Sequence, residues 1–156
     1  MSSLPALELK IPPVAVALLI AAAMWSGSLA LSSSSPPSAI QFVVALTLAA
    51  TGATVAVIGV VSFRRARTTV NPMNFKGTSS LVTVGIYRFT RNPMYLGILL
   101  VIVGLGVLLG SMWFLLGPVA FVLYMNRFQI KAEERVLTQL FGAPYTEYMA
   151  SVRRWL

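Results

Sequence analysis

Two clusters of polar residues flank a long apolar stretch, and their residue types suit the binding of charged groups. The first cluster, Tyr87–Gly97, contains Arg88, Arg91 and an Asn92-Pro93 pair. This pair predicts a helix start, because Asn suits the N-cap and Pro the first helical position. The free N–H groups of a helix start, next to a guanidinium, can hold an anion. A capped helix start with no ligand explains the same pattern.

The second cluster is the acidic pair Glu133 and Glu134. The pair fits the solvated face of a surface helix, or a carboxylate that accepts hydrogen bonds from a cofactor's ammonium or hydroxyl groups. The chain has no His and no Cys, so it lacks the commonest general base and any thiolate nucleophile. It has only four carboxylates, all of them glutamates, so we expect no protein-built metal site.

The composition indicates an integral membrane protein of one domain. Hydrophobic residues make up 57% of the 156 residues, and charged residues make up 10%, against about 25% in soluble domains. The mean hydropathy is +0.81. The net charge of +8 does not favour nucleic acid as a partner, because the basic residues flank apolar spans in the manner of the positive-inside rule.

The elements that must position the two clusters are all expected to be helical. Ile11–Leu31 and Ile40–Phe63 predict two membrane spans, the first of them a retained anchor. The 35 uncharged residues from Asn92 to Asn126 would form a helix of about 52 Å, far longer than the roughly 30 Å hydrocarbon core. We therefore predict two short spans that turn at Leu109–Met112, with a single kinked helix as the alternative.

After Arg127, apolar and charged residues alternate at helical spacing, which predicts an amphipathic surface helix ended by Gly142. In the second span, Gly52 and Gly59 predict close packing against a neighbouring helix. The predicted fold is thus an all-α polytopic membrane protein. It has about four transmembrane helices, the last two forming a tight hairpin, plus a cytosolic amphipathic C-terminal helix. With four spans all twelve Lys and Arg lie on one side, so both termini and the site are expected in the cytosol.

At this point the sequence resembles a known family. The run Thr83–Gly97, the hairpin, and the pattern Glu133-Glu134-x-x-Leu137-x-x-x-Phe141-Gly142-x-x-Tyr145-x-x-Tyr148 are similar to the isoprenylcysteine carboxyl methyltransferase family. That family shares its design with phospholipid methyltransferases. The resemblance covers residues 76–154 and does not extend to the first two spans.

The resemblance implies a helical membrane enzyme that transfers a methyl group from S-adenosylmethionine to a lipophilic acceptor in the bilayer. Within a single domain, 1–156, residues 1–67 would form two N-terminal spans and 68–156 a methyltransferase-like core. The implied cofactor contacts are Ser79, Ser80, Leu81, Val82, Gly85, Tyr87, Arg91, Asn92, Tyr95, Leu96 and Glu133. The implied catalytic residues are Arg127, Gln129 and Glu134.

Two positions depart from the family pattern. Asn92 stands where the family usually has His, so it can hydrogen-bond but cannot titrate. Gln129 stands where prenylcysteine methylating enzymes have an Arg that is thought to hold the substrate carboxylate. Arg127 and Lys131 flank this position and are the candidate substitutes. A neutral amide predicts poor activity on prenylated cysteines with a free carboxylate.

Two other functions stay open at this stage. The chain could be a non-catalytic membrane protein that keeps the cofactor pocket as a sensor or scaffold. It could also be a small transporter or assembly factor, although no charged residue lies inside a predicted span. The sequence names neither the methyl acceptor, which could be a carboxylate, an amine, a thiol or a lipid head group, nor the oligomeric state.

Overall fold

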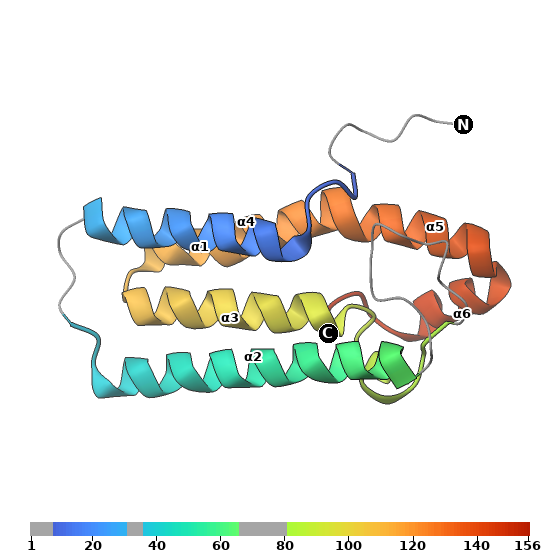
Figure 1. The fold of residues 1–156 in the computed structure, drawn as a ribbon, viewed down its shortest axis with the longest axis horizontal. Coiled ribbons are helices and arrows are strands. Elements are labelled where there is room, and N and C mark those ends of the chain that lie inside the picture. The colour runs from blue at the N-terminus through green and yellow to red at the C-terminus, as the bar shows by residue number, and fades with distance from the viewer. Residues whose placement is uncertain (1–7, 31–35, 66–80) are drawn as a thin grey trace.

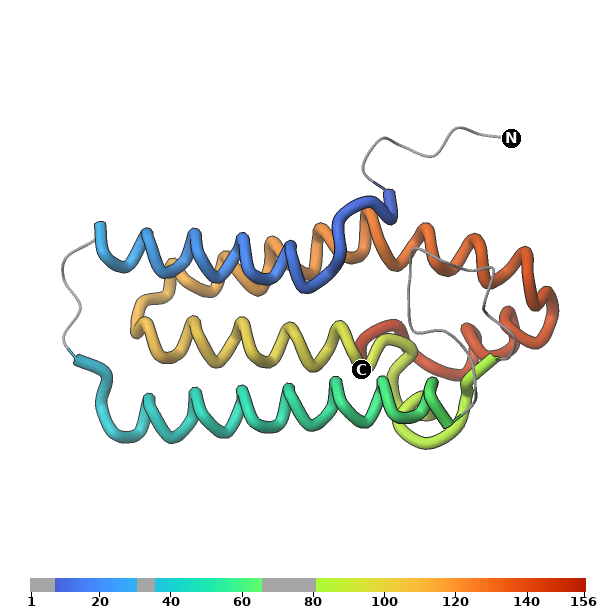
Figure 2. Tube along the Cα trace, in the orientation of Figure 1, coloured from blue at the N-terminus to red at the C-terminus, as the bar shows by residue number. Residues whose placement is uncertain are grey.

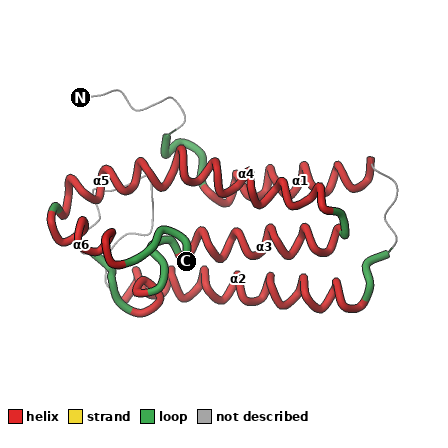
Figure 3. Tube along the Cα trace, turned by 180° about the vertical axis from the view of Figure 1, so that it is seen from behind, coloured by secondary structure: helices red, strands yellow, loops and turns green. Residues whose placement is uncertain are grey.

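The computed structural model describes residues 8–30, 36–65 and 81–156, which form helices and loops without a strand. The elements, in chain order, are α1 (Pro13–Ala30), α2 (Ala39–Arg65), a 3-10 helix η2 (Gly85–Arg88), α3 (Pro93–Leu109), a 3-10 helix η3 (Met112–Leu115), α4 (Leu116–Tyr124), a π-helix η4 (Met125–Ile130), α5 (Lys131–Phe141) and α6 (Ala143–Ser151). Helices α1 to α4 lie side by side as a bundle (Figure 1), and the back view shows the same all-helical arrangement (Figure 3). The fold is therefore all-α, as predicted.

Two helices are long and apolar enough to cross a membrane, α1 with 18 residues and α2 with 27. Only 17% of each apolar stretch is buried inside the protein. Large side chains such as Leu18 and Leu46 are 65% and 59% exposed. An apolar surface of this kind needs a lipid environment, so this is a membrane protein. The third apolar helix, α3, is shorter, with 17 residues.

The long uncharged run is divided where the sequence predicted. Helix α3 ends at Leu109, and Gly110 follows with a left-handed φ of +71° while its N–H donates to the carbonyl of Val107. Glycine adopts this conformation at no steric cost, so it ends the helix. The chain then turns back along α3 through η3 and α4 (Figure 1). The alternative of a single kinked helix is wrong.

Helices α2 and α3 are in close contact through glycines. A side-chain carbon at Gly52 would overlap the carbonyl oxygen of Gly97, and one at Gly97 would overlap the carbonyl oxygen of Gly52. Gly59 likewise faces Met94, and a Cβ added at Gly59 would lie 2.9 Å from Cγ of that residue. The predicted role of Gly52 and Gly59 in close packing is confirmed. Their contact places the C-terminal end of α2 against the start of α3.

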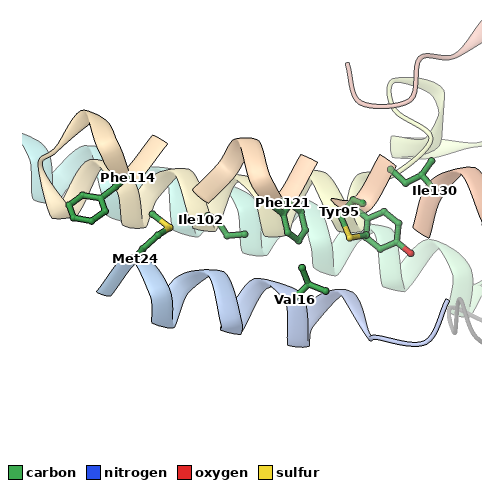
Figure 4. Packing of buried hydrophobic residues seen from close by; sticks show 8 residues of the cluster. Val16, Met24, Tyr95, Ile102, Phe114, Phe121 and Ile130 are labelled. Carbon is green, nitrogen blue, oxygen red and sulfur yellow. The ribbon is translucent and has the colours of Figure 1, made fainter. Parts of the chain in front are cut away.

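The apolar core follows the length of the bundle. A row of buried side chains begins with Phe114 and Met24 at the hairpin end, passes Ile102 and Phe121, and reaches Tyr95 and Ile130 at the opposite end (Figure 4). This last pair marks the point where the bundle gives way to α5 and α6. The polar residues of both sequence clusters are gathered at this end.

Helix α4 passes into α5 without a break, through the π-helix η4. Helix α5 ends at Phe141, where Gly142 has φ +60° and ψ −129°. This conformation is essentially restricted to glycine. It reverses the chain, so α6 returns toward α2 and η2 (Figure 1).

Candidate active site

A pocket opens at the end of the bundle where α5 and α6 meet the starts of η2 and α3. Its empty volume is about 650 Å³, with the open solvent at its mouth included. The lining residues are Phe63, Leu81, Val82, Tyr87, Arg91, Asn92, Met94, Tyr95, Ile130, Glu133, Glu134, Leu137, Phe141, Tyr145 and Tyr148. The two sequence clusters thus form one site, although about 40 residues separate Asn92 from Glu133.

Glu133 is the central polar group of the pocket. Its Oε1 accepts a hydrogen bond from the hydroxyl of Tyr95 and another from Nε2 of Gln129, at 2.9 Å. The side chain reaches the pocket, yet protein atoms surround its carboxylate. Burial raises the pKa of Glu133 to about 7, although the two hydrogen bonds oppose this shift. A carboxyl group with this pKa exchanges a proton near neutral pH.

Glu134 belongs to an ion-pair network instead. Its Oε1 lies 3.0 Å from Nη1 of Arg91. Arg154, in the C-terminal tail, donates from Nε to Oε1 at 3.0 Å and from Nη2 to Oε2 at 2.6 Å. This two-point contact fixes the carboxylate in one orientation. The solvated-face interpretation of the acidic pair is therefore wrong for both glutamates in this structure.

Asn92 occupies the N-cap position of α3, and Pro93 is the first helical residue, as predicted. The side chain of Asn92 does not cap the helix, however. Its Nδ2 donates to the carbonyl oxygen of Arg154 at 2.9 Å, and the N–H of Arg91 donates to the carbonyl of Arg153. Asn92 therefore joins the tail to the pocket wall.

An aromatic wall faces the acidic pair. Tyr87 and Tyr148 are connected by a hydrogen bond from the Tyr148 hydroxyl to the Tyr87 carbonyl, at 2.7 Å. Burial raises the pKa of Tyr87 and Tyr148, and raises that of Tyr145 to about 12. All three are therefore neutral hydroxyl groups at physiological pH. The Tyr87 hydroxyl and Nε of Arg91 are buried and lack a hydrogen-bond partner among the described residues.

The structure brings most of the predicted cofactor residues to the pocket. Leu81, Val82, Tyr87, Arg91, Asn92, Tyr95 and Glu133 all line it. Leu96 is buried beside Tyr95, and Gly85 begins η2 with a φ of +65°. Neither of these two lines the pocket. Ser79 and Ser80 lie outside the described residues.

Two of the three predicted catalytic residues, Arg127 and Gln129, do not line the pocket. Arg127 is 54% exposed and pairs with Glu8 at 3.4 Å, on the side of the helix away from the pocket. Gln129 is buried, and its amide donates to Glu133 instead of lining the pocket. Residues two apart on a helix face in nearly opposite directions, which explains the divergence of Arg127 and Gln129. Glu134 does line the pocket. Lys131, the other candidate substitute, is exposed.

Sequence reasoning missed Arg154 and Phe63. Arg154 lies 20 residues after its partner Glu134, and no local spacing links the two. Phe63 ends the second span and packs edge to face on Tyr87, with ring centroids 5.3 Å apart. Its position just before Arg64 placed it at the membrane boundary, but nothing in the sequence indicated its partner.

Among the described residues, a pocket with two carboxylates, one guanidinium and several tyrosines lies at one end of an apolar helical bundle. The model of the phospholipid methyltransferase family matches residues 40–144 of the chain. The chain therefore belongs to this family. The match includes all of α2 after its first residue, so the expectation that the second span carries no family signal is wrong.

Two of the curated proteins that the chain resembles are named as methyltransferases. The chain is 35% identical over 116 residues to a probable protein-S-isoprenylcysteine O-methyltransferase of Oryza sativa subsp. indica, covering 72% of this chain and 59% of the rice protein. It is 36% identical over 96 residues to protein-S-isoprenylcysteine O-methyltransferase A of Arabidopsis thaliana, covering 60% of this chain and 47% of the Arabidopsis protein. It is also 43% identical over 63 residues to an uncharacterized protein of Haemophilus influenzae, covering 40% of this chain and all of that protein. The chain thus spans about half to three fifths of its plant relatives. No solved structure matches the chain.

Proposed function

We propose that the chain is a membrane methyltransferase that binds S-adenosylmethionine in the pocket and methylates a lipophilic acceptor arriving from the bilayer. The observation that carries the proposal is Glu133. It is a carboxylate held by Tyr95 and Gln129 on the pocket wall, at the junction between the apolar bundle and the polar end. Family membership and the names of the plant relatives support the same reaction class.

The pocket fits the chemical groups of the cofactor. The Tyr87 hydroxyl and Arg91 Nε, which lack a hydrogen-bond partner among the described residues, are donors suited to a carboxylate. Glu133 is an acceptor suited to an ammonium group or a ribose hydroxyl, and the aromatic rings of Tyr145 and Phe141 suit an adenine or a cationic sulfonium. When bound, S-adenosylmethionine would supply an activated methyl group, so the protein mainly has to align the acceptor with it.

The charges around the pocket do not favour a free carboxylate as the acceptor. Among the described residues, its lining contains Glu133, Glu134 and one guanidinium, Arg91, which already lies against Glu134. Gln129 is turned toward Glu133, and Arg127 points away. An acceptor that carries a proton, such as an amine, suits this site better.

We further propose four membrane spans, α1 to α4, with the pocket and both termini in the cytosol. Ten basic residues of the described part lie at or beyond the pocket end of the bundle, namely Lys10, Arg64, Arg65, Arg88, Arg91, Arg127, Lys131, Arg135, Arg153 and Arg154. The hairpin end has Gly110 and Ser111 and no charge between α3 and α4. This distribution supports the positive-inside orientation. It leaves α5 and α6 on the cytosolic surface.

The test combines binding and turnover. Titration calorimetry of the detergent-purified protein with S-adenosylhomocysteine should give saturable binding, which Glu133→Gln weakens about 10- to 150-fold, the equivalent of one charge-assisted hydrogen bond. Membrane lipid extracts should then acquire label from methyl-labelled S-adenosylmethionine. Absence of binding would overturn the proposal. Binding without turnover on any lipid fraction would favour the alternative, a sensor or scaffold that keeps the cofactor pocket.

A further inference from the structure

The described segment 8–12, which precedes α1, lies beside the junction between α4 and α5 (Figure 2). Its Glu8 has a side chain only 1% exposed, and both carboxylate oxygens are in ion pairs. Oε1 lies 3.4 Å from Nη1 of Arg127, and Oε2 lies 2.6 Å from Nη2 of Arg135. One carboxylate therefore joins a residue within η4 to a residue in the second turn of α5.

The backbone of the same segment is also held at this junction. The N–H of Leu9 donates to the carbonyl oxygen of Phe128, within η4, at 3.3 Å. Leu9 has φ +58°, and among the described residues it is the one non-glycine position with a positive φ. Such a conformation persists only where the surrounding contacts impose it. Its occurrence beside Glu8 indicates that the contacts with η4 are specific.

The junction itself sets the direction in which the site residues point. A π-helix accommodates about one residue more per turn than an α-helix, which rotates the following helix by about 100° relative to the preceding one. Gln129 lies within η4, and Glu133 lies in the first turn of α5. The location of η4 therefore decides whether both side chains face Tyr95. Arg127 and Arg135 lie two residues from Gln129 and Glu133, so they are on the other side of the helix.

We propose that Glu8 is a positioning residue, which fixes the π-helical junction from outside through Arg127 and Arg135 and thereby keeps Gln129 and Glu133 directed at the pocket. Glu8 does not line the pocket, and it acts through the helix that lies between it and the pocket. The consequence for cofactor binding rests on the proposed function, whereas the consequence for Glu133 does not.

The environment of Glu133 can be followed directly by the titration of its carboxyl group. The chain contains four carboxylates, Glu8, Glu133, Glu134 and Glu147, so ¹³C labelling of glutamate gives four side-chain carboxyl signals that single substitutions assign. In the full chain in detergent, Glu133 should titrate with a pKa of about 7. We expect Glu8→Gln to lower this midpoint by about one unit or more, because water reaches a carboxylate that is no longer held in place. Amide exchange over residues 125–135 should accelerate about tenfold.

A second variant separates positioning from simple electrostatics. Removing the negative charge of Glu8 would by itself lower the pKa of Glu133, whereas removing the positive charge of Arg135 by Arg135→Gln would raise it. Loss of positioning lowers the midpoint in both variants. Arg135 is 48% exposed, so this second substitution is made at the accessible end of the ion pair and not at the buried Glu8. Glu147→Gln, at an exposed site on α6, is the matched control and should leave Glu133 unchanged.

Affinity for S-adenosylhomocysteine provides an independent measurement. It should fall about tenfold in Glu8→Gln and Arg135→Gln and stay unchanged in Glu147→Gln. If the unmodified protein does not bind this ligand, the proposed function fails, while the Glu133 titration still tests the role of Glu8. Lower melting temperatures with wild-type titration of Glu133 and wild-type exchange over 125–135 would reduce Glu8 to a contributor to stability. Shifts of opposite sign in the two variants would also overturn the proposal.

Discussion

Tyr95 in α3 and Glu133 in α5 are 38 residues apart in the sequence, and the hydroxyl of the first donates a hydrogen bond to Oε1 of the second. This bond connects a helix of the apolar bundle to a helix of the polar end. Tyr95 is also part of the bundle core, packed with Ile130 (Figure 4). The orientation of the pocket carboxylate is therefore tied to the packing of the bundle.

Tyr95→Phe should raise the pKa of Glu133 above its value of about 7, because the hydrogen bond from Tyr95 lowers that pKa. The net loss of stability should be about 1 kcal/mol, as for a typical intramolecular hydrogen bond. Glutamate ¹³C titration and thermal unfolding measure the two effects. Tyr124→Phe is the matched control, because the buried Tyr124 hydroxyl has no partner among the described residues. An unchanged Glu133 midpoint in Tyr95→Phe would contradict the structure.

The stability of the protein should depend on pH through Glu133. The folded pKa is about 7, above the ordinary value of 4.5, so between these values the folded state binds a proton that the unfolded state does not. The contribution of Glu133 to the free energy of unfolding is then fully present below pH 4.5. It is lost as the pH rises through 7, and this loss amounts to about 3 kcal/mol. Glu133→Gln should remove this decline, as measured by urea or thermal unfolding in detergent at a series of pH values. If stability depended on pH in the same way in the wild-type protein and in Glu133→Gln, the role of Glu133 in this pH dependence would be refuted.

Arg154→Ala should loosen the tail and reorient Glu134. The substitution removes a two-point contact with Glu134, and Arg154 is 31% exposed. We expect a loss of about 1–2 kcal/mol, at the lower end of charged hydrogen bonds because water screens the pair. Arg153→Ala is the control, since that side chain is exposed. The comparison is made by melting temperature, and equal effects of the two substitutions would argue against the Glu134 contact.

Gly52→Ala should disrupt the contact between α2 and α3. The added carbon overlaps the carbonyl of Gly97, and backbone cannot move aside as a flexible side chain would. We expect destabilisation of about 1–3 kcal/mol, typical of overpacking. Gly27→Ala, whose new carbon would lie 3.7 Å from the ring of Phe114, should be tolerated. Unfolding of both variants in detergent checks this, and a stable Gly52→Ala protein would show that the helices are further apart.

Reporter fusions test the proposed topology. A fusion at Ser111, in the turn between α3 and α4, should report the side opposite the cytosol, and one at Leu156 should report the cytosol. An alkaline phosphatase reporter and a fluorescent reporter give complementary signals at the two positions. A cytosolic signal at Ser111 would mean that α3 and α4 do not cross the membrane as a hairpin.

The sequence predicted those features that a few neighbouring residues determine. Gly110 ends α3, Asn92-Pro93 starts it, and Gly142 ends α5, because each acts through its own backbone conformation. The contacts that close the site were not predictable in this way. Glu8 pairs with Arg127 across 119 residues, and no spacing rule links such distant positions.

The π-helix had no sequence signal either. A regular helix and a helix with one extra residue per turn have the same hydrophobic pattern over a short segment. Which side chains face the pocket is decided by packing against α1, α3 and the segment before α1. The resemblance to a family located the site, but the orientation of Gln129 required the structure.

Gly142 has a consequence for the pocket that goes beyond ending a helix. Its φ of +60° and ψ of −129° are the mirror image of the extended conformation that ordinary residues adopt. A D-amino acid would take this conformation readily, and achiral glycine is the genetically encoded residue that can stand in for one. Tyr145 and Tyr148 reach the pocket because α6 follows this reversal. The aromatic wall of the site thus depends on one position where the chain has the opposite handedness.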